Sequence, residues 1–185
     1  FPAVPELVVV LGQQGATRSG QTHGHFLPDS WAESDNGDSR LHEMMLSGES
    51  LKRGAEETLG TILHECAHAY AHVEGIKDTS NNGRYHNKKF LEIGNKFGLD
   101  LECSGTIGWS ITTLSGGTAK KYRSELDELD AALKVYRVVQ VKPEAAKPKK
   151  FMMQCYTCQD AVPVTKKWFE RNKYTLYCRE HGESF

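Results

Sequence analysis

The sequence contains no apolar run long enough to cross a membrane. A membrane helix needs roughly 18 or more consecutive apolar residues, and the mean hydropathy of the 185-residue chain is −0.54. The opening segment PELVVVLG is also too short, and wrongly flanked, for a signal peptide. The sequence therefore predicts a cytoplasmic, intracellular protein without a membrane partner.

The chain also has little net charge, yet its two ends differ. Residues 1–133 carry 12 Lys+Arg against 19 Asp+Glu, whereas residues 134–185 carry 11 against 5. A basic segment favours an anionic partner, most commonly nucleic acid, although a solvated lysine-rich surface would have the same composition. DNA is therefore an expected partner, and association with the nucleoid would follow from it.

Large apolar side chains are scarce at 140–150, where only Val141 is present beside two prolines and four lysines. Such a composition is typical of a linker. We therefore expect a domain at 1–139, a linker at 140–150 and a module at 151–185. The module is too short to fold on a hydrophobic core alone.

Cysteine is limited to five residues, an odd number that argues against a disulfide framework. Cys155 and Cys158 form the sequence CYTC, Cys178 and His181 form CREH, and 19 residues separate the two pairs. Two such pairs at this separation predict a zinc ribbon, in which four ligands close a tetrahedral structural site.

Basic and aromatic residues alternate between these two pairs. The basic residues are candidates for phosphate contacts, and aromatic rings can stack on bases. Trp168 and Phe169 can equally fill the small core of the module. The candidate DNA-binding residues are Lys166, Lys167, Arg171 and Lys173.

Hydrophobic periodicity predicts an α+β fold in the first domain. A β-branched run predicts a buried strand at 5–12, and further strands are expected at 23–31, 39–47 and 100–114. Apolar residues at helical spacing predict helices at 54–74 and 86–98, each closed by a glycine, and a third helix at 118–139. In the third helix the predicted buried face comprises Tyr122, Leu126, Leu129, Leu133 and Tyr136.

The pentad HECAH at 64–68 lies inside the first predicted helix. Residues four apart lie about 6 Å along a helix axis and about 40° around it, so His64 and His68 can bind one metal ion. Glu65 is offset by one residue, which lets it take a proton from the water that zinc activates. The pattern predicts a catalytic zinc site with Glu65 as the base.

Such a site needs a third protein ligand and one open position. His72 is about 12 Å along the axis from His64, too far to share a zinc ion. His86, which opens the second helix after a turn, is preferred over Glu92, which lies further along and roughly on its opposite face.

The segments LGTILHECAHAYAHVEGI and GRYHNKKFLEIGNKFGL resemble the SprT-like metallopeptidases, the group that includes the Spartan DNA–protein crosslink proteases. In that family the third histidine begins a His-Gly-x-x-Phe motif, which His86-Asn87-Lys88-Lys89-Phe90 matches except at Asn87. The overall pattern is more similar to actinobacterial and phage-encoded members than to Spartan itself. The resemblance implies a zincin-like domain, His86 as third ligand and a zinc ribbon after the protease.

These features predict a zinc-dependent endopeptidase that hydrolyses protein substrates associated with DNA. It would hold two Zn²⁺ ions, one catalytic and one structural. The alternative is a nucleic-acid-binding zinc protein in which the histidine site is structural or regulatory, although such a site has no need of Glu65. A zinc hydrolase acting on non-peptide amides is a third interpretation.

Overall fold

The computed structural model describes residues 1–185 except 14–15, 18–19, 35–38, 139–149, 173–176 and 184–185. The chain divides into an N-terminal unit, Phe1–Val139, and a C-terminal unit, Gln140–Phe185. The predicted linker lies outside the described residues except for Lys150, which already begins a strand. In neither unit does the described part of the chain include a helix that is long and apolar enough to span a membrane.

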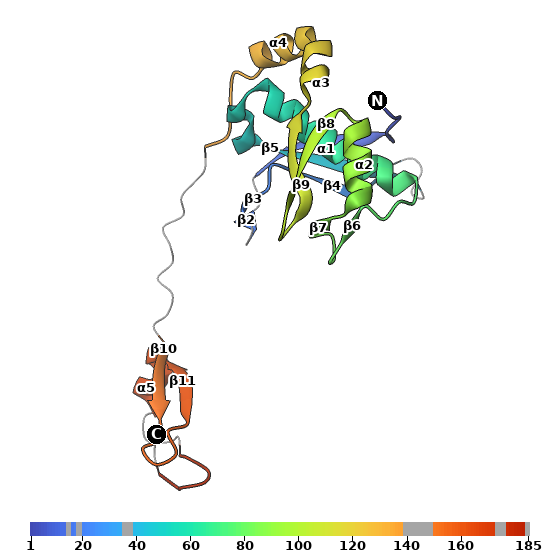
Figure 1. The fold of residues 1–185 in the computed structure, drawn as a ribbon. Helices are drawn as coiled ribbons and strands as arrows, with labels where there is room; N and C mark the ends of the chain where they lie inside the picture. The colour runs from blue at the N-terminus through green and yellow to red at the C-terminus, as the bar shows by residue number, and fades with distance from the viewer. Residues whose placement is uncertain (14–15, 18–19, 35–38, 139–149, 173–176, 184–185) are drawn as a thin grey trace. The chain divides into compact units, whose positions relative to one another are not determined.

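Two sheets with helices between and beside them make the N-terminal unit an α+β fold (Figure 1). The first sheet has the order β1-β5-β4, with β1 (Leu7–Gly12) parallel and β4 (Gly24–Ala32) antiparallel to the central β5 (Arg40–Ser47). The short strands β2 (Ala16–Thr17) and β3 (Gly20–Gln21) form a separate pair. The strands predicted at 23–31 and 39–47 are thus confirmed.

The second sheet has the order β6-β7-β9-β8. Its members are β6 (Thr79–Ser80), β7 (Tyr85–His86), β8 (Leu99–Ser104) and β9 (Gly108–Leu114). Strands β8 and β9 are the extended segment expected at 100–114. The β7–β9 pairing is parallel and places His86 opposite Gly108.

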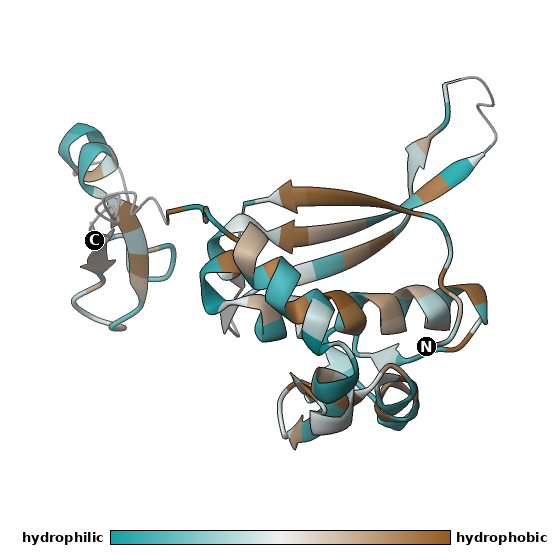
Figure 2. Ribbon diagram, turned by 90° about the horizontal axis from the view of Figure 1, so that it is seen from above, coloured by the Kyte–Doolittle hydropathy of each residue, from teal (hydrophilic) through white to brown (hydrophobic). Residues whose placement is uncertain are grey.

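The long helix α1 (Ala55–Val73) packs against both sheets and against α2 (Lys88–Lys96). Figure 2 shows the first sheet as one layer with α1 alongside it. Two acidic residues in the first turn of α1, Glu56 and Glu57, interact favourably with the positive end of the helix dipole and so stabilise the helix start. Both helices are followed by glycines with positive φ, Gly75 at 62° and Gly98 at 72°, as the sequence predicted.

The core of the N-terminal unit lies between α1, α2 and the start of β8. Its fully buried members are Leu63, Ala67, Ala71, Phe90, Ile93, Phe97 and Leu99. Alanines on α1 allow α2 to approach closely, and the aromatic rings of α2 fill the space that remains. This packing fixes the position of α2 and of the residues just before it.

The strand at the N-terminus differs from the expectation of a buried strand. Val9 and Leu11 of β1 are 60% and 66% exposed. These two residues alternate with less exposed ones along β1, so they lie on one face of the sheet, and that face is the one left uncovered. The apolar run was therefore a correct signal for a strand and a wrong signal for its burial.

The third predicted helix is also shorter than expected and is broken. The structure has α3 (Gly116–Lys121) and α4 (Arg123–Ala132), with Leu126 buried and Tyr136 exposed. Beyond α4, the backbone N–H of Arg137 donates to the carbonyl of Gly48, and its guanidinium pairs with Glu49 at 3.4 Å. These contacts draw the chain onto the 3₁₀ helix Gly48–Arg53 instead of continuing the helix.

The C-terminal unit contains a hairpin and one short helix. Strand β10 (Lys150–Gln154) pairs antiparallel with β11 (Ala161–Thr165), and α5 (Lys166–Asn172) follows directly. The buried apolar residues among those described are Met153, Val164 and two cysteines. So small an apolar interior agrees with the expectation that this unit needs another source of stability.

Candidate active site

Three histidines from two elements meet beside the core. His64 and His68 project from α1 with ring centroids 5.0 Å apart, and His86 in β7 lies 5.1 Å and 5.0 Å from them. Their ligand nitrogens are all within 4.8 Å of one another. The structure thus brings together the three histidines that the sequence singled out.

Two of the rings are oriented by acceptors on their outer side. His68 Nδ1 lies 2.6 Å from a carboxylate oxygen of Asp78, and His86 Nδ1 lies 3.4 Å from the carbonyl oxygen of Ile107. Because these oxygens accept hydrogen bonds, each Nδ1 carries a proton, and in a neutral ring the Nε2 atom then presents its lone pair. Those two Nε2 atoms face each other at 3.0 Å.

Two lone pairs at this distance repel each other unless a cation lies between them. Tetrahedral zinc with Zn–N bonds of about 2.05 Å places its nitrogen ligands about 3.3 Å apart, close to the separation of the two Nε2 atoms. His64 Nδ1 is 3.2 Å from Thr112 Oγ1, a contact that leaves its Nε2 for the same ion. The donor set therefore fits a divalent metal ion.

The environment keeps the imidazoles of His64 and His86 neutral, which is the form that binds metal. Burial, reinforced by the neighbouring histidines, lowers the pKa of His64 well below 6.5. Burial likewise lowers the pKa of His86 to about 4. The ring of Phe90, which is fully buried, lies 4.5–4.7 Å from all three imidazole centroids and forms an apolar base beneath them.

Glu65 lies next to this cluster without belonging to it. Its side chain is buried, and desolvation raises the pKa of its carboxyl to about 7. The backbone N–H of Phe26 in β4 donates to the carboxylate, which opposes this rise. A Cβ at Gly24 would lie 3.0 Å from Glu65 Oε1, so a glycine at this position leaves room for the carboxylate.

A cleft of about 1480 Å³ contains the histidines and Glu65. This exceeds the roughly 300–1,000 Å³ typical of small-molecule sites and suits a longer ligand. One wall is β4, contributing Gly24, His25 and Phe26, and the other includes β9. Among the described strands, β4 is the outer strand of its sheet, so its edge away from β5 has no strand partner there, and β4 residues line the cleft.

The other candidates for the third ligand lie elsewhere. Glu92 is exposed on α2, and His72 groups with Asp29 and His42 instead. Cys66, inside the pentad, is free, and burial raises the pKa of its thiol to about 11. A thiol with so high a pKa is unreactive at neutral pH, and Cys66 instead packs, partly buried, against the core.

Sequence reasoning did not find the residues that orient the rings. Asp78 lies in the polar connection after α1, and Thr112 lies on β9, far along the chain from His64. Neither stands at a recognisable spacing from the pentad. Their roles arise from the pairing of β6, β7 and β9, which sequence periodicity does not reveal.

A second cluster of potential ligands lies in the C-terminal unit. It comprises Cys155, Cys158, Cys178 and His181. The Cys158 and Cys178 sulfurs are 3.7 Å apart, and His181 Nδ1 is 3.4 Å from the Cys178 sulfur and 3.9 Å from the Cys155 sulfur. No disulfide joins the five described cysteines. Tetrahedral zinc with Zn–S bonds of about 2.3 Å has sulfurs about 3.7 Å apart, so the four side chains can hold a metal ion.

Two similar turns build this second cluster. In one, Gln159 N–H donates to Cys155 C=O and Cys155 N–H to Asp160 C=O; in the other, Gly182 and Glu183 make the equivalent bonds with Cys178. Gln159 and Gly182 both have left-handed φ values, 66° and 65°. Hydrogen bonding to His181 lowers the pKa of the Cys178 thiol to about 7, which favours the metal-binding thiolate.

The predicted DNA-contacting residues are described in part. Lys166, Lys167 and Arg171 are exposed on α5, whereas Lys173 lies outside the described residues. Lys166 pairs with Glu170 at 3.8 Å, and Lys167 and Arg171 share one face at i,i+4 spacing. Trp168 is 37% exposed, so its ring is only partly covered.

Comparison of the chain with protein-family models, with curated proteins and with solved structures found no match.

Proposed function

We propose that the N-terminal unit is a zincin-like, SprT-like metallopeptidase that hydrolyses peptide bonds. The observation that carries the proposal is the close approach of the Nε2 atoms of His68 and His86, 3.0 Å apart, completed by His64, with Glu65 beside them. A structural site has no use for a buried carboxylate that takes no part in ligation. A site with three ligands and an adjacent base suits hydrolysis.

A bound zinc ion would lower the pKa of a water molecule and polarise a substrate carbonyl. Glu65 is the group that removes the water proton and passes it to the leaving amine. Burial raises the pKa of its carboxyl, which makes Glu65 a stronger base than an exposed glutamate. The Phe26 N–H holds its carboxylate in place between these two transfers.

The free edge of β4 supports a peptide as substrate. An extended peptide can pair with an edge strand through its backbone, which fixes a scissile bond with little dependence on side chains. Gly24 and His25 of β4 line the cleft that holds the histidines. This arrangement favours an endopeptidase over a hydrolase of small amides.

The C-terminal unit is proposed to be a zinc ribbon that brings the protease to DNA. The four ligands supply the zinc site, and α5 supplies an exposed basic pair, Lys167 and Arg171. Protein substrates bound to DNA would then lie within reach of the cleft. This role also agrees with the basic composition of residues 134–185.

The test is Glu65→Gln in the full chain, assayed on casein and by self-cleavage, with and without DNA. We expect turnover to fall by at least about 10²-fold, because general-base catalysis contributes about 10²–10⁴-fold. Zinc content should stay unchanged, since Glu65 is no ligand. Glu92→Gln, an exposed site on α2, is the matched control and should keep full activity.

Equal peptidase activity in Glu65→Gln and the parent would refute the proposal. DNA that leaves the cleavage rate unchanged would refute only the role of the C-terminal unit.

A further inference from the structure

A third group of metal-binding side chains lies on the N-terminal unit, apart from the three histidines already described. It consists of Asp29, His42 and His72, whose ligand atoms are all within 4.8 Å of one another. Each comes from a different element, β4, β5 and α1 respectively. Two imidazoles and a carboxylate form a donor set that suits Zn²⁺ and related first-row divalent ions.

The carboxylate of Asp29 lies near both imidazole rings. Asp29 Oδ1 is 3.5 Å from His42 Nδ1, and Asp29 Oδ2 is 3.9 Å from His72 Nε2. Each oxygen therefore faces a different imidazole. The ring centroids of His42 and His72 lie 5.1 Å apart, close to the 5.0–5.1 Å found among the three active-site histidines.

The protonation of His42 is set by its neighbour. The backbone N–H of Asp29 donates to His42 Nδ1 at 3.0 Å. Because a backbone N–H can only donate, Nδ1 is the unprotonated nitrogen, and its lone pair accepts this hydrogen bond. A bound ion would take that lone pair in place of the Asp29 N–H. An imidazole nitrogen binds metal in this unprotonated form.

The backbone at Asp29 produces this arrangement. Its φ of 53° lies in the left-handed region, which aspartate tolerates better than most residues. The β4–β5 register is irregular between Leu27 and Trp31, so this turn is where the edge strand departs from its partner. Phe26 packs against both imidazoles, at 5.7 Å and 5.8 Å, and fixes one side of the cluster.

We propose that Asp29, His42 and His72 form a second zinc site on the N-terminal unit, which ties the edge strand β4 to β5 and to the end of α1. His72 follows His68 by one turn, about 6 Å along the helix axis. The site therefore adjoins the active site, and its ligand Asp29 belongs to β4, the strand that forms one wall of the cleft. Three protein ligands leave one position open to water, and the side chains of Asp29 and His72 are 58% and 40% exposed, so the ion is exchangeable.

The experiment measures zinc per chain by equilibrium dialysis of the full-length protein over a range of free Zn²⁺, followed by elemental analysis. The parent is expected to bind one more equivalent than either His72→Gln or Asp29→Asn. Loss of one ligand should weaken this equivalent by at least about tenfold, because even outer-shell changes cost 10–100-fold. Asparagine tolerates a left-handed φ, so Asp29→Asn keeps the local backbone.

The matched controls are His25→Gln and Asp127→Asn. Their parent side chains are 37% and 60% exposed and, like the proposed ligands, take part in ion pairs, but they lie in no such cluster among the described residues. Both should bind as much zinc as the parent. Because the result is a difference of one equivalent between variants, it does not depend on peptidase activity.

Two results would overturn the proposal. One is that parent, His72→Gln and Asp29→Asn bind the same number of zinc ions at every free concentration, which would make the cluster an ion-paired group without a metal. The other is that His25→Gln and Asp127→Asn also bind one zinc ion fewer than the parent.

Discussion

At the scale of single residues, Asp78 determines which nitrogen of His68 faces the metal position. The 2.6 Å contact holds the proton on Nδ1 and leaves Nε2 as the ligand. It also increases the basicity of that nitrogen. The affinity of the site thus depends on a residue that binds no metal.

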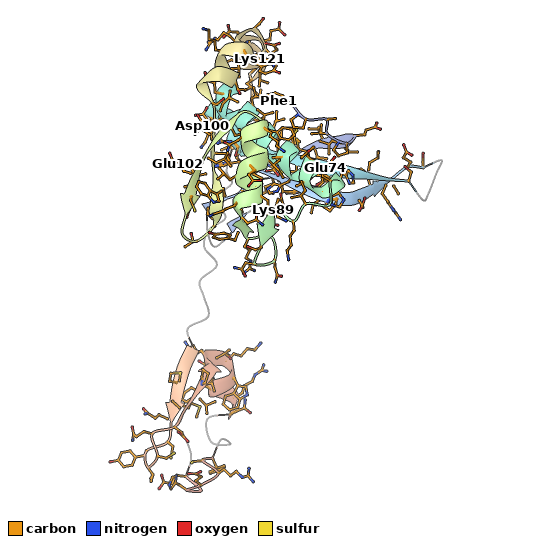
Figure 3. The ribbon with its side chains drawn as sticks, turned by 45° about the vertical axis from the view of Figure 1, so that its right-hand side comes forward. Phe1, Glu74, Lys89, Asp100, Glu102 and Lys121 are labelled. Atoms are coloured by element: carbon orange, nitrogen blue, oxygen red, sulfur yellow. The ribbon has the colours of Figure 1, made fainter. Side chains whose placement is uncertain are left out.

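We expect Asp78→Asn to weaken zinc binding at the three histidines by about 10–100-fold, the usual effect of losing such a partner. Competition with a chromogenic chelator measures this affinity. Asp100→Asn, at an exposed position on β8 labelled in Figure 3, should leave it unchanged. Equal affinities in the two variants would show that Asp78 does not orient the ring.

Phe90 belongs to the hydrophobic core and also contacts the three imidazoles of the site. Phe90→Leu and Phe97→Leu each remove an aromatic ring from a fully or almost fully buried position. Both should lower the free energy of unfolding by about 1–2 kcal/mol, part of the 3–5 kcal/mol typical of Phe→Ala.

Only Phe90→Leu should also weaken zinc binding, because Phe97 stacks on Phe1 and meets Tyr70 edge-to-face, whereas Phe90 contacts the imidazoles. Urea unfolding and chelator competition separate the two effects. Equal zinc affinity in the two variants would show that the Phe90 ring does not support the three imidazoles.

At the scale of elements, the pairing of β7 with β9 positions His86. Gly108 lies opposite His86 with a φ of 70°, and a Cβ there would overlap the carbonyl oxygen of His86. Only glycine meets both conditions, the left-handed conformation and the close approach. A backbone contact therefore holds His86, the proposed third ligand, in place.

Gly108→Ala should lower the free energy of unfolding by about 1–3 kcal/mol from backbone strain. It should also reduce the affinity for zinc, because the His86 backbone must move. Thermal unfolding measures the change in stability, and zinc titration measures the change in affinity. Gly105→Ala, where a Cβ would meet nothing within 4 Å, should change stability by less than about 0.5 kcal/mol. Normal zinc affinity in Gly108→Ala would show that β7 is not what places His86.

The same elements show what sequence can predict. Helices α1 and α2 were predicted to within about two residues, because periodicity, caps and terminal glycines are local signals. His64 and His68 share a face for the same local reason. Asn87, which stands where the motif of the family that the sequence resembles has glycine, caps α2 by accepting from Lys89 N–H at 2.8 Å, so asparagine suits the helix start.

Features set by distant contacts were missed. The third helix was predicted too long, because the contacts of Arg137 with Gly48 and Glu49 join parts of the chain almost ninety residues apart. The burial of β1 was overestimated, since the apolar run does not show that one face of its sheet is left uncovered. The roles of Asp78 and Thr112 were not predicted because they also depend on contacts between distant parts of the chain. The same is true of the cluster of Asp29, His42 and His72.

At the scale of the whole molecule, the two units draw their stability from different sources. The N-terminal unit has a continuous core around α1 and α2, whereas few apolar residues of the C-terminal unit are buried among those described. In small units of this kind, metal binding supplies folding free energy of about 10–16 kcal/mol. The two units should therefore respond differently to loss of a ligand.

Cys178→Ser should release one zinc ion per chain and unfold the C-terminal unit while the N-terminal unit stays folded. Amide NMR signals of residues 150–172 should lose their dispersion, and thermal unfolding of the N-terminal unit should be unchanged. Cys103→Ser, which replaces an exposed cysteine on β8, is the control and should keep both zinc content and spectrum. A dispersed spectrum for Cys178→Ser would mean that β10, β11 and α5 fold without metal, so the cysteine cluster would not be what stabilises this unit.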